Sequence, residues 1–162
     1  MTSVFPILLL GVALAAPCVV RAAEPPPDPA PCDAAIASGD DDRIIAVCGA
    51  LIGHDATLRA DKARALIARA GAYARKERTD DAIADDDAAL RIDPANAAVL
   101  NARGELLRKK GDRPRAIRDF SAAMKIDPAL EAARANYKSL AREIERLGAT
   151  MPVPPQPMAP LK

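Results

Sequence analysis

The sequence has few aromatic residues: two Tyr, two Phe and no Trp occur among its 162 residues, although half of the residues are hydrophobic. The most frequent apolar residue is alanine, which occurs 37 times. A β-sandwich or barrel needs β-branched and aromatic side chains on its pleated faces, and these are scarce here. Alanine combined with Leu, Arg and Glu instead favours helices that pack closely together. The composition therefore predicts an all-α protein.

An excess of charge of one sign is also absent. The chain carries 23 Lys and Arg against 22 Asp and Glu, a formal net charge of +1, and its basic residues alternate with acidic ones. A nucleic-acid-binding domain normally presents a strongly basic face, so we expect no nucleic-acid partner. The length allows at most one ordinary domain.

Residues suited to catalysis or metal binding are few. The single His54 has no partner nucleophile, and no Gly-rich phosphate loop is present, so we expect neither enzyme activity nor a cofactor. Asp40–Asp42 and Asp85–Asp87 are acidic runs, but consecutive helical residues point about 100° apart and no Asp-x-Asp-x-Asp-Gly loop occurs. We therefore predict no metal site, and we expect His54 at the surface near a helix end.

Proline divides the chain, because twelve of the fifteen Pro lie in residues 1–31 or 149–162. The intervening body is Pro-poor and can form long helices. Residues 23–31 are expected to form an extended, semi-rigid linker. The Pro-rich tail, residues 149–162, is expected to be disordered, either simply solvated or offering its PxxP pairs to an aromatic groove.

The N-terminal segment, residues 1–22, is predicted to be a signal peptide. Val4–Ala16 is an apolar run of suitable length that is too short to span a bilayer. Small residues at Val20 and Ala22 predict cleavage after Ala22, which would make the protein periplasmic or secreted. The alternatives are a lipoprotein acylated at Cys18 and a retained membrane anchor. Any membrane contact is expected only through this segment when it is uncleaved.

Two cysteines, Cys32 and Cys48, remain after removal of the predicted signal. An even pair in an exported chain predicts a disulfide, here joining two short helices on either side of a turn at Gly39. Closing a loop of about 15 residues in this way stabilises the fold by roughly 3 kcal/mol. A zinc site with His54 would have too few ligands, and the spacing is not that of a Cys-x-x-Cys redox motif.

The central part of the chain contains a repeat of 34 residues. The matching positions are Leu66, Arg69, Ala70, Ala82, Ile83, Ala89, Ile92, Asp93 and Pro94, which return as Leu100, Arg103, Gly104, Ala116, Ile117, Ala123, Ile126, Asp127 and Pro128. Each unit is predicted to contain two helices, 66–76 and 79–92 in the first and 100–110 and 112–126 in the second. An Asp-Pro pair then ends each unit.

This pattern resembles the tetratricopeptide repeat (TPR) family, whose units place a bulky residue at position 4, small residues at 8, 20 and 27, and Pro at 32. Units beginning at Ala63 and Ala97 match at Leu66, Ala70, Ala82, Ala89 and Pro94, and at Leu100, Gly104, Ala116, Ala123 and Pro128. The resemblance implies an all-α, TPR-type helix-turn-helix solenoid with two full repeats, residues 63–96 and 97–130.

The resemblance also organises the flanks of these repeats into one domain, residues 32–148. Asp42–Leu51 resembles the second helix of a degenerate N-terminal half repeat, which the Cys32–Cys48 disulfide would link. Residues 131–147 resemble the capping helix that shields the last unit of such arrays, with Gly148 expected to end it. The whole order is similar to that of small exported TPR proteins of the bacterial envelope.

Position 24 is normally aromatic in the TPR family. Phe120 agrees with this preference, but the first unit has Asp86. An unpaired buried carboxylate is costly. Two hypotheses follow: Asp86 pairs with Arg69 or Arg103 on the facing helices, or it turns to solvent in a loosened unit.

The family resemblance further implies a concave groove lined by the first helix of each unit. The lining residues would be Arg64, Ile67, Gly71, Ala74, Arg75, Ala98, Asn101, Glu105, Arg108 and Lys109. With four cations against one Glu the groove would be mildly basic and would suit an acidic or C-terminal peptide; the alternative is that these are solvated helix-face charges. Ile67, Gly71 and Ala102 stand where the family's Lys/Asn carboxylate clamp needs polar groups.

The predicted function is a non-catalytic protein–protein interaction module of the bacterial cell envelope that binds a peptide or protein partner in this groove. The alternative is a structural scaffold subunit that stacks with copies of itself through its repeat ends. The sequence leaves the oligomeric state open.

Overall fold

The computed structural model describes residues 25–150, which form seven α-helices and no strand. The predicted signal peptide and residues 151–162 of the predicted tail lie outside the described residues. The helices are α1 (Ala30–Ser38), α2 (Asp41–Gly53), α3 (Arg59–Arg75), α4 (Thr79–Ile92), α5 (Ala97–Lys109), α6 (Arg113–Ile126) and α7 (Glu131–Thr150). None of these helices is both long and apolar enough to cross a membrane.

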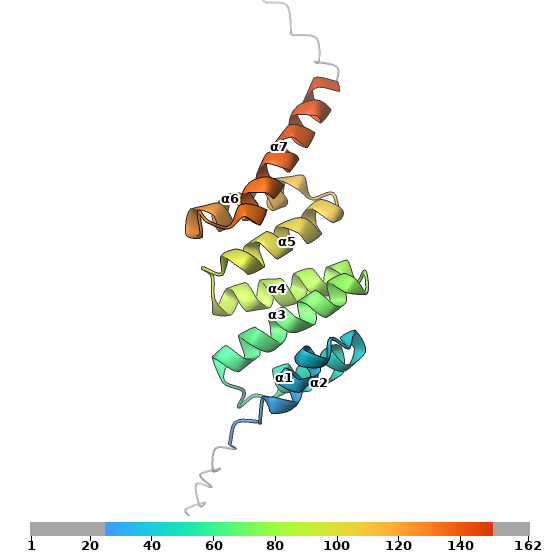
Figure 1. Cartoon of the computed structure of the whole chain (residues 1–162), viewed down its shortest axis with the longest axis vertical. Helices are drawn as coiled ribbons and strands as arrows, with labels where there is room; N and C mark the ends of the chain where they lie inside the picture. The colour runs from blue at the N-terminus through green and yellow to red at the C-terminus, as the bar shows by residue number, and fades with distance from the viewer. Residues whose placement is uncertain (1–24, 151–162) are drawn as a thin grey trace, which may run out of the picture.

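The helices stack in chain order along the long axis of the molecule, with α1 and α2 at one end and α7 at the other (Figure 1). Each helix packs against the next one in sequence. The predicted TPR-type solenoid is therefore confirmed: α3 and α4 form one helix pair, α5 and α6 form the next, α1 and α2 form a shorter N-terminal pair, and α7 covers α6.

Side-chain caps explain where several helices begin. The Asp40 carboxylate accepts hydrogen bonds from the backbone N–H groups of Asp42 and Arg43, at 3.1 and 3.2 Å. Asn96 caps α5 through the N–H of Val99, at 3.1 Å. Asp112 caps α6 in the same way, and Pro114 lies in the first turn of that helix, where it has no N–H to leave unpaired.

Two helices extend beyond their expected ends. Helix α3 begins at Arg59, before the unit start expected at Ala63, and α7 continues to Thr150 through Gly148. Gly148 therefore lies within the helix instead of ending it.

The core is a continuous series of small clusters between neighbouring helices, and it uses alanine where helices approach closely. One cluster contains Leu66 of α3, Leu90 of α4 and Leu100 of α5, together with buried alanines of α4, α5, α6 and α7. At the N-terminal end, the predicted Cys32–Cys48 disulfide is present and lies in a second cluster between α1, α2 and α3. Phe120 is the largest fully buried side chain, in a third cluster with Leu107 and Leu140.

Candidate functional site

The first helices of the pairs line two apolar pockets on one face. The larger, about 640 Å³, lies between α3 and α5 with α4 beneath it; its lining residues are Ile67, Ala70, Gly71, Ala74, Asp86, Asn96, Ala98, Val99, Ala102, Glu105, Leu106 and Lys109. The smaller, about 610 Å³, lies between α1 and α3 and is lined by Ile36, Arg64 and Ala68 among others. Ile67 belongs to both pockets and is 38% exposed, so the two pockets adjoin at this side chain.

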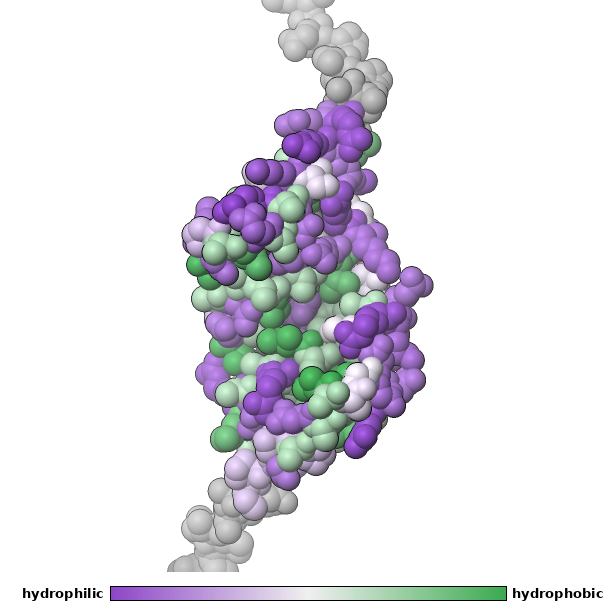
Figure 2. Space-filling view, viewed as in Figure 1, coloured by the Kyte–Doolittle hydropathy of each residue, from purple (hydrophilic) through white to green (hydrophobic). Residues whose placement is uncertain are grey.

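Apolar side chains dominate this surface. Figure 2 shows hydrophobic residues gathered over the middle of the molecule, at the level of α3 to α5, with hydrophilic residues on either side. Ala70, Gly71 and Ala74 on α3 keep the larger pocket open, because bulkier side chains at these positions would fill it. The two pockets together are called the α1–α3–α5 groove below.

The structure brings seven of the ten expected groove residues into these pockets. The larger pocket is lined by Ile67, Gly71, Ala74, Ala98, Glu105 and Lys109, and the smaller one by Ile67 and Arg64. Asn101 lies beside them: its amide donates to Glu105 at 3.0 Å, and its carbonyl oxygen accepts a 3.0 Å hydrogen bond from Asn136 of α7.

The four expected groove cations are all engaged in ion pairs. Arg64 pairs with Asp33 of α1 at 3.0 Å and Arg75 with Asp41 of α2 at 2.6 Å. Arg108 pairs with Glu143 of α7 at 3.0 Å. Lys109 lies 3.7 Å from Glu77. Arg75 and Arg108 line neither pocket and instead connect first helices to neighbouring helices.

Glu143 receives two arginines, Arg108 from α5 and Arg113 from α6. The hydrogen bond from Arg113 is the largest cause that lowers the pKa of Glu143, and the hydrogen bond from Arg108 adds to it. These contacts attach α7 to the second repeat.

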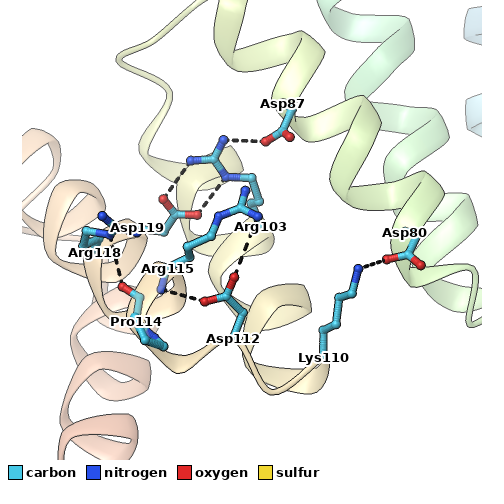
Figure 3. Close-up of polar contacts among 9 residues, drawn as sticks. All are labelled: Asp80, Asp87, Arg103, Lys110, Asp112, Pro114, Arg115, Arg118 and Asp119. Atoms are coloured by element: carbon cyan, nitrogen blue, oxygen red, sulfur yellow. Dashed lines mark hydrogen bonds and ion pairs between the residues drawn. The ribbon is translucent and has the colours of Figure 1, made fainter.

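A second polar system lies between the helices of each repeat. Arg69 of α3 donates two hydrogen bonds of 2.7 Å to Asp85 of α4. In the next repeat Arg103 donates to Asp119 at 2.8 and 2.7 Å, and its third nitrogen reaches Asp87 of α4 at 2.7 Å (Figure 3). In both repeats the arginine precedes its aspartate by 16 residues; each such pair, Arg69–Asp85 or Arg103–Asp119, is called an Arg–Asp fork below. The hydrogen bond within the fork is the largest cause that raises the pKa of each arginine.

The hypothesis that Asp86 pairs with Arg69 or Arg103 is wrong. Both arginines do face acidic residues, but the partners are Asp85, Asp119 and Asp87. Neighbouring residues on a helix differ in direction by about 100°, so Asp86 cannot share the position of Asp85. The opposite hypothesis is wrong as well, because Asp86 does not turn to solvent: it is only 3% exposed.

Asp86 is thus a buried carboxyl group without a partner. Its Oδ2 atom has no hydrogen bond among the described residues, and the side chain lines the larger pocket. Burial raises the pKa of Asp86 to about 7; the charge of Arg103 lowers it in part, and Asp85, Asp87 and Asp119 raise it further. Near neutral pH the protonated and the ionised forms of this group are therefore both populated.

Other expected residues lie away from the groove. His54 follows the last residue of α2, where its ring nitrogen Nδ1 accepts from the N–H of Ala56 at 3.3 Å. Within residues 25–150, no three His, Cys, Asp or Glu side chains group as a metal site would need, and this includes the runs Asp40–Asp42 and Asp85–Asp87.

The residues that sequence reasoning missed are Asp85 and Asp119. They are 34 residues apart, as are their partners Arg69 and Arg103, so the repeat itself carried the signal. The signal is an acidic residue one position before repeat position 24, with an arginine 16 residues earlier in the chain.

Comparisons with known proteins identify the fold. No protein-family model matches the chain, and no curated protein matches it. Among solved structures, the first TPR domain of Spaghetti (RPAP3), bound to the HSP90 peptide SRMEEVD, superposes with a TM-score of 0.63 at 17% identity, over 70% of this chain and 87% of that one. The OM64 TPR domain of Arabidopsis superposes with a TM-score of 0.62 at 20% identity, over 70% of this chain and 90% of that one.

The Sgt2 TPR domain of Aspergillus fumigatus gives a TM-score of 0.63 at 18% identity, covering 80% of this chain and 85% of that domain. These likenesses show that the chain has the fold of TPR domains.

Proposed function

We propose that this protein is a non-enzymatic interaction module that binds an extended segment of a protein partner in the α1–α3–α5 groove. The observation that carries the proposal is the pair of adjoining apolar pockets, of about 640 and 610 Å³, that meet at the exposed Ile67. Pockets of this size accommodate side chains of a bound peptide. One structure of the same fold, the RPAP3 domain, holds a peptide, which supports this class of ligand.

The sequence favours an acidic or C-terminal peptide, and Lys109 is the cation best placed to meet one. It lies at the rim of the larger pocket, and its 3.7 Å pair with Glu77 is long and solvent-exposed. Arg75 and Arg108 would first have to leave Asp41 and Glu143. Lys109→Glu therefore tests the acidic preference better than charge reversal of the two arginines, which would break contacts between helices.

We also propose that the protein works in the bacterial envelope or outside the cell, after cleavage near Ala22. The Cys32–Cys48 disulfide supports this compartment, because disulfides persist where the surroundings are oxidising. Mass spectrometry of the protein purified from its source would test the proposal. A mature N-terminus at Ala23 with both thiols oxidised is expected, whereas an intact residue 1–22 segment or free thiols would contradict it.

The groove is tested by filling it. Ala102 lies on α5 and lines the larger pocket, whereas Ala84 is exposed on α4 and lines neither pocket. The full chain and its Ala102→Tyr and Ala84→Tyr variants would be used as bait in affinity capture from a lysate of the source organism. We expect Ala102→Tyr to lose the captured partner and Ala84→Tyr to retain it, with both variants keeping the helical circular dichroism spectrum. Equal capture by all three would contradict the groove.

Self-assembly through the α7 end is the second candidate function. Ile126 and Ile144 are 43% and 39% exposed near this end, and large exposed apolar side chains suit contacts between copies. Light scattering on the purified chain separates the candidates. A multimer that dissociates on dilution, and that Ile144→Glu disrupts, supports assembly; a monomer at all concentrations contradicts it.

A further inference from the structure

The floor of the larger pocket carries a carboxyl group, Asp86, that pairs with no other side chain within residues 25–150. Asp86 of α4 lines this pocket between α3 and α5, and only 3% of its surface is exposed. Its Oδ2 atom has no hydrogen bond among residues 25–150. A buried carboxyl group without a partner is unfavourable for folding, so its place in a pocket calls for a functional explanation.

The charges around Asp86 show which ligand it would accept. The α3 wall consists of Ile67, Ala70, Gly71 and Ala74, which carry no charge. Arg103 of α5, whose charge lowers the pKa of Asp86, is held by Asp119 and Asp87 and does not hydrogen-bond to Asp86.

The α5 wall contributes one acid, Glu105, and one cation, Lys109, at the rim. Glu105 receives amide hydrogen bonds from Asn101 and Asn136 but has no ion pair among the described residues. Lys109 is drawn toward Glu77, outside the pocket lining. The interior of the pocket is therefore apolar along its walls and acidic at its floor.

We propose that this pocket binds a basic side chain, Lys or Arg, of the partner peptide, with Asp86 as the carboxylate that pairs with its cationic head. The proposal rests on the proposed function and names the chemistry of one of its subsites. The methylene stem of a Lys or Arg would contact Ile67 and the alanines, since such stems pack on apolar surface while their charged heads seek a polar partner.

Other occupants fit less well. A carboxylate would be repelled by Asp86 and Glu105, and a purely aliphatic side chain would seal the unpaired carboxyl group from water without giving it a hydrogen bond. An acidic group elsewhere on the same peptide is compatible with this arrangement, because Lys109 lies at the rim and Asp86 at the floor.

Three small probes of similar length test the pocket directly: n-butylammonium, pentanoate and 1-pentanol. Each would be titrated at pH 8 into the isotope-labelled full chain while the amide signals of Gly71, Ala74 and Ala102 and the side-chain carboxyl signal of Asp86 are followed by NMR. Asp86→Asn removes the charge without changing shape. Asp81→Asn is the matched control, because Asp81 lies on the same helix but is exposed and pairs with Arg78.

We expect n-butylammonium to give saturable shifts at these positions in the wild type and in Asp81→Asn. Its binding to Asp86→Asn should be at least about tenfold weaker, the loss expected for one charge-assisted hydrogen bond. Equal binding to the Asp86→Asn variant, stronger binding of pentanoate or 1-pentanol, or no saturable shift with n-butylammonium would each overturn the proposal.

These failures are distinguishable from failure of the proposed function. If Ala102→Tyr abolishes partner capture while n-butylammonium binds equally to wild type and Asp86→Asn, the groove is used but Asp86 is not its cation site. If Ala102→Tyr leaves capture unchanged, the groove proposal itself is contradicted.

Discussion

The two full repeats, α3–α4 and α5–α6, have the same helix pairing but differ in the side chains packed between their helices. Both contain the Arg–Asp fork, Arg69–Asp85 in the first and Arg103–Asp119 in the second. In the second repeat Phe120 is fully buried and its ring packs against Gly104, where an added Cβ would lie 2.6 Å from a ring carbon. The corresponding positions of the first repeat hold Asp86 and Ala70.

This difference shows what the aromatic slot does. The side of α6 that carries Phe120 is closed by Leu140 and Tyr137 of α7, so the ring completes a core. The side of α4 that carries Asp86 opens into the larger pocket, because a carboxyl group fills less space than a ring. The first repeat thus has a pocket where the second has a packed core, at the expense of an unpaired buried carboxyl group.

The turns between the paired helices also differ, and again the residue of the second repeat fits its conformation better. Residues 77 and 111 occupy the same position of the repeat, and both have a left-handed backbone, with φ of 58° at Glu77 and 89° at Gly111. Glycine adopts this conformation without a steric penalty, whereas a residue with a Cβ does not. The turn of the first repeat therefore carries a steric penalty that the turn of the second repeat avoids.

Removal of the Phe120 ring should have the largest effect. We expect Phe120→Ala to lower the free energy of unfolding by about 4 kcal/mol, the usual cost of a large cavity in a core. Urea denaturation followed by circular dichroism would measure it. Phe120→Leu retains much of the volume and should lose less than half as much; an equal loss would show that the ring is not held by packing.

Substitution of Asp86 should have the opposite sign and a strong pH dependence. The pKa of this carboxyl group rises from 3.8 to about 7 on folding, so the folded state holds the proton more tightly and the wild type loses stability as pH rises from about 4 to 7. We expect Asp86→Asn to be more stable than the wild type by about 4 kcal/mol at pH 8 and by little at pH 4.

Thermal unfolding of both proteins across this pH range would measure the difference. A constant difference between pH 4 and 8 would contradict the burial of an ionisable Asp86, and Asp81→Asn should show no such trend because its side chain is exposed.

The close contact between Gly104 and Phe120 predicts an unusual response to alanine. Alanine normally stabilises a helix by about 1 kcal/mol relative to glycine, but Gly104→Ala should lower the free energy of unfolding by about 1 kcal/mol because overpacking outweighs this gain. Gly71→Ala on α3 is the comparison, since its Cβ would meet only the flexible end of Arg75 at 3.4 Å. If both variants gain stability in chemical denaturation, the packing contrast between the repeats is wrong.

The smallest effect is expected at the turn of the first repeat. Glu77→Gly should raise the free energy of unfolding by about 1 kcal/mol, because it removes a side chain from a left-handed residue. The lost pair with Lys109 is exposed and contributes little. The reverse change, Gly111→Ala, should lower the melting temperature; if it does not, the two turns are not equivalent.

Much of the fold could be predicted because it depends on local pattern. The 34-residue period and the capping residues gave the helix pairs, and α4 lies where its apolar spacing predicted, at Thr79–Ile92. The pairing of Cys32 with Cys48 followed from composition, since only two cysteines remained after the predicted signal.

The site was less predictable because it depends on side-chain direction between helices. Arg75 and Arg108 satisfy the family's groove positions, yet they turn toward Asp41 and Glu143 on neighbouring helices. No spacing within one helix reveals such a choice, because it is made by whichever opposite charge lies within reach after packing.

The sequence by itself determined the helix pairs, their order and the positions where small residues allow close approach. Only the tertiary structure decided that Arg69 and Arg103 select Asp85 and Asp119, and that Asp86 is buried at the floor of a pocket. The physical reason is that a repeat pattern specifies which residues face a neighbour, whereas the distance and direction between two side chains arise only when the helices meet. Asp86, one residue from a satisfied carboxylate, is left without a partner by that geometry.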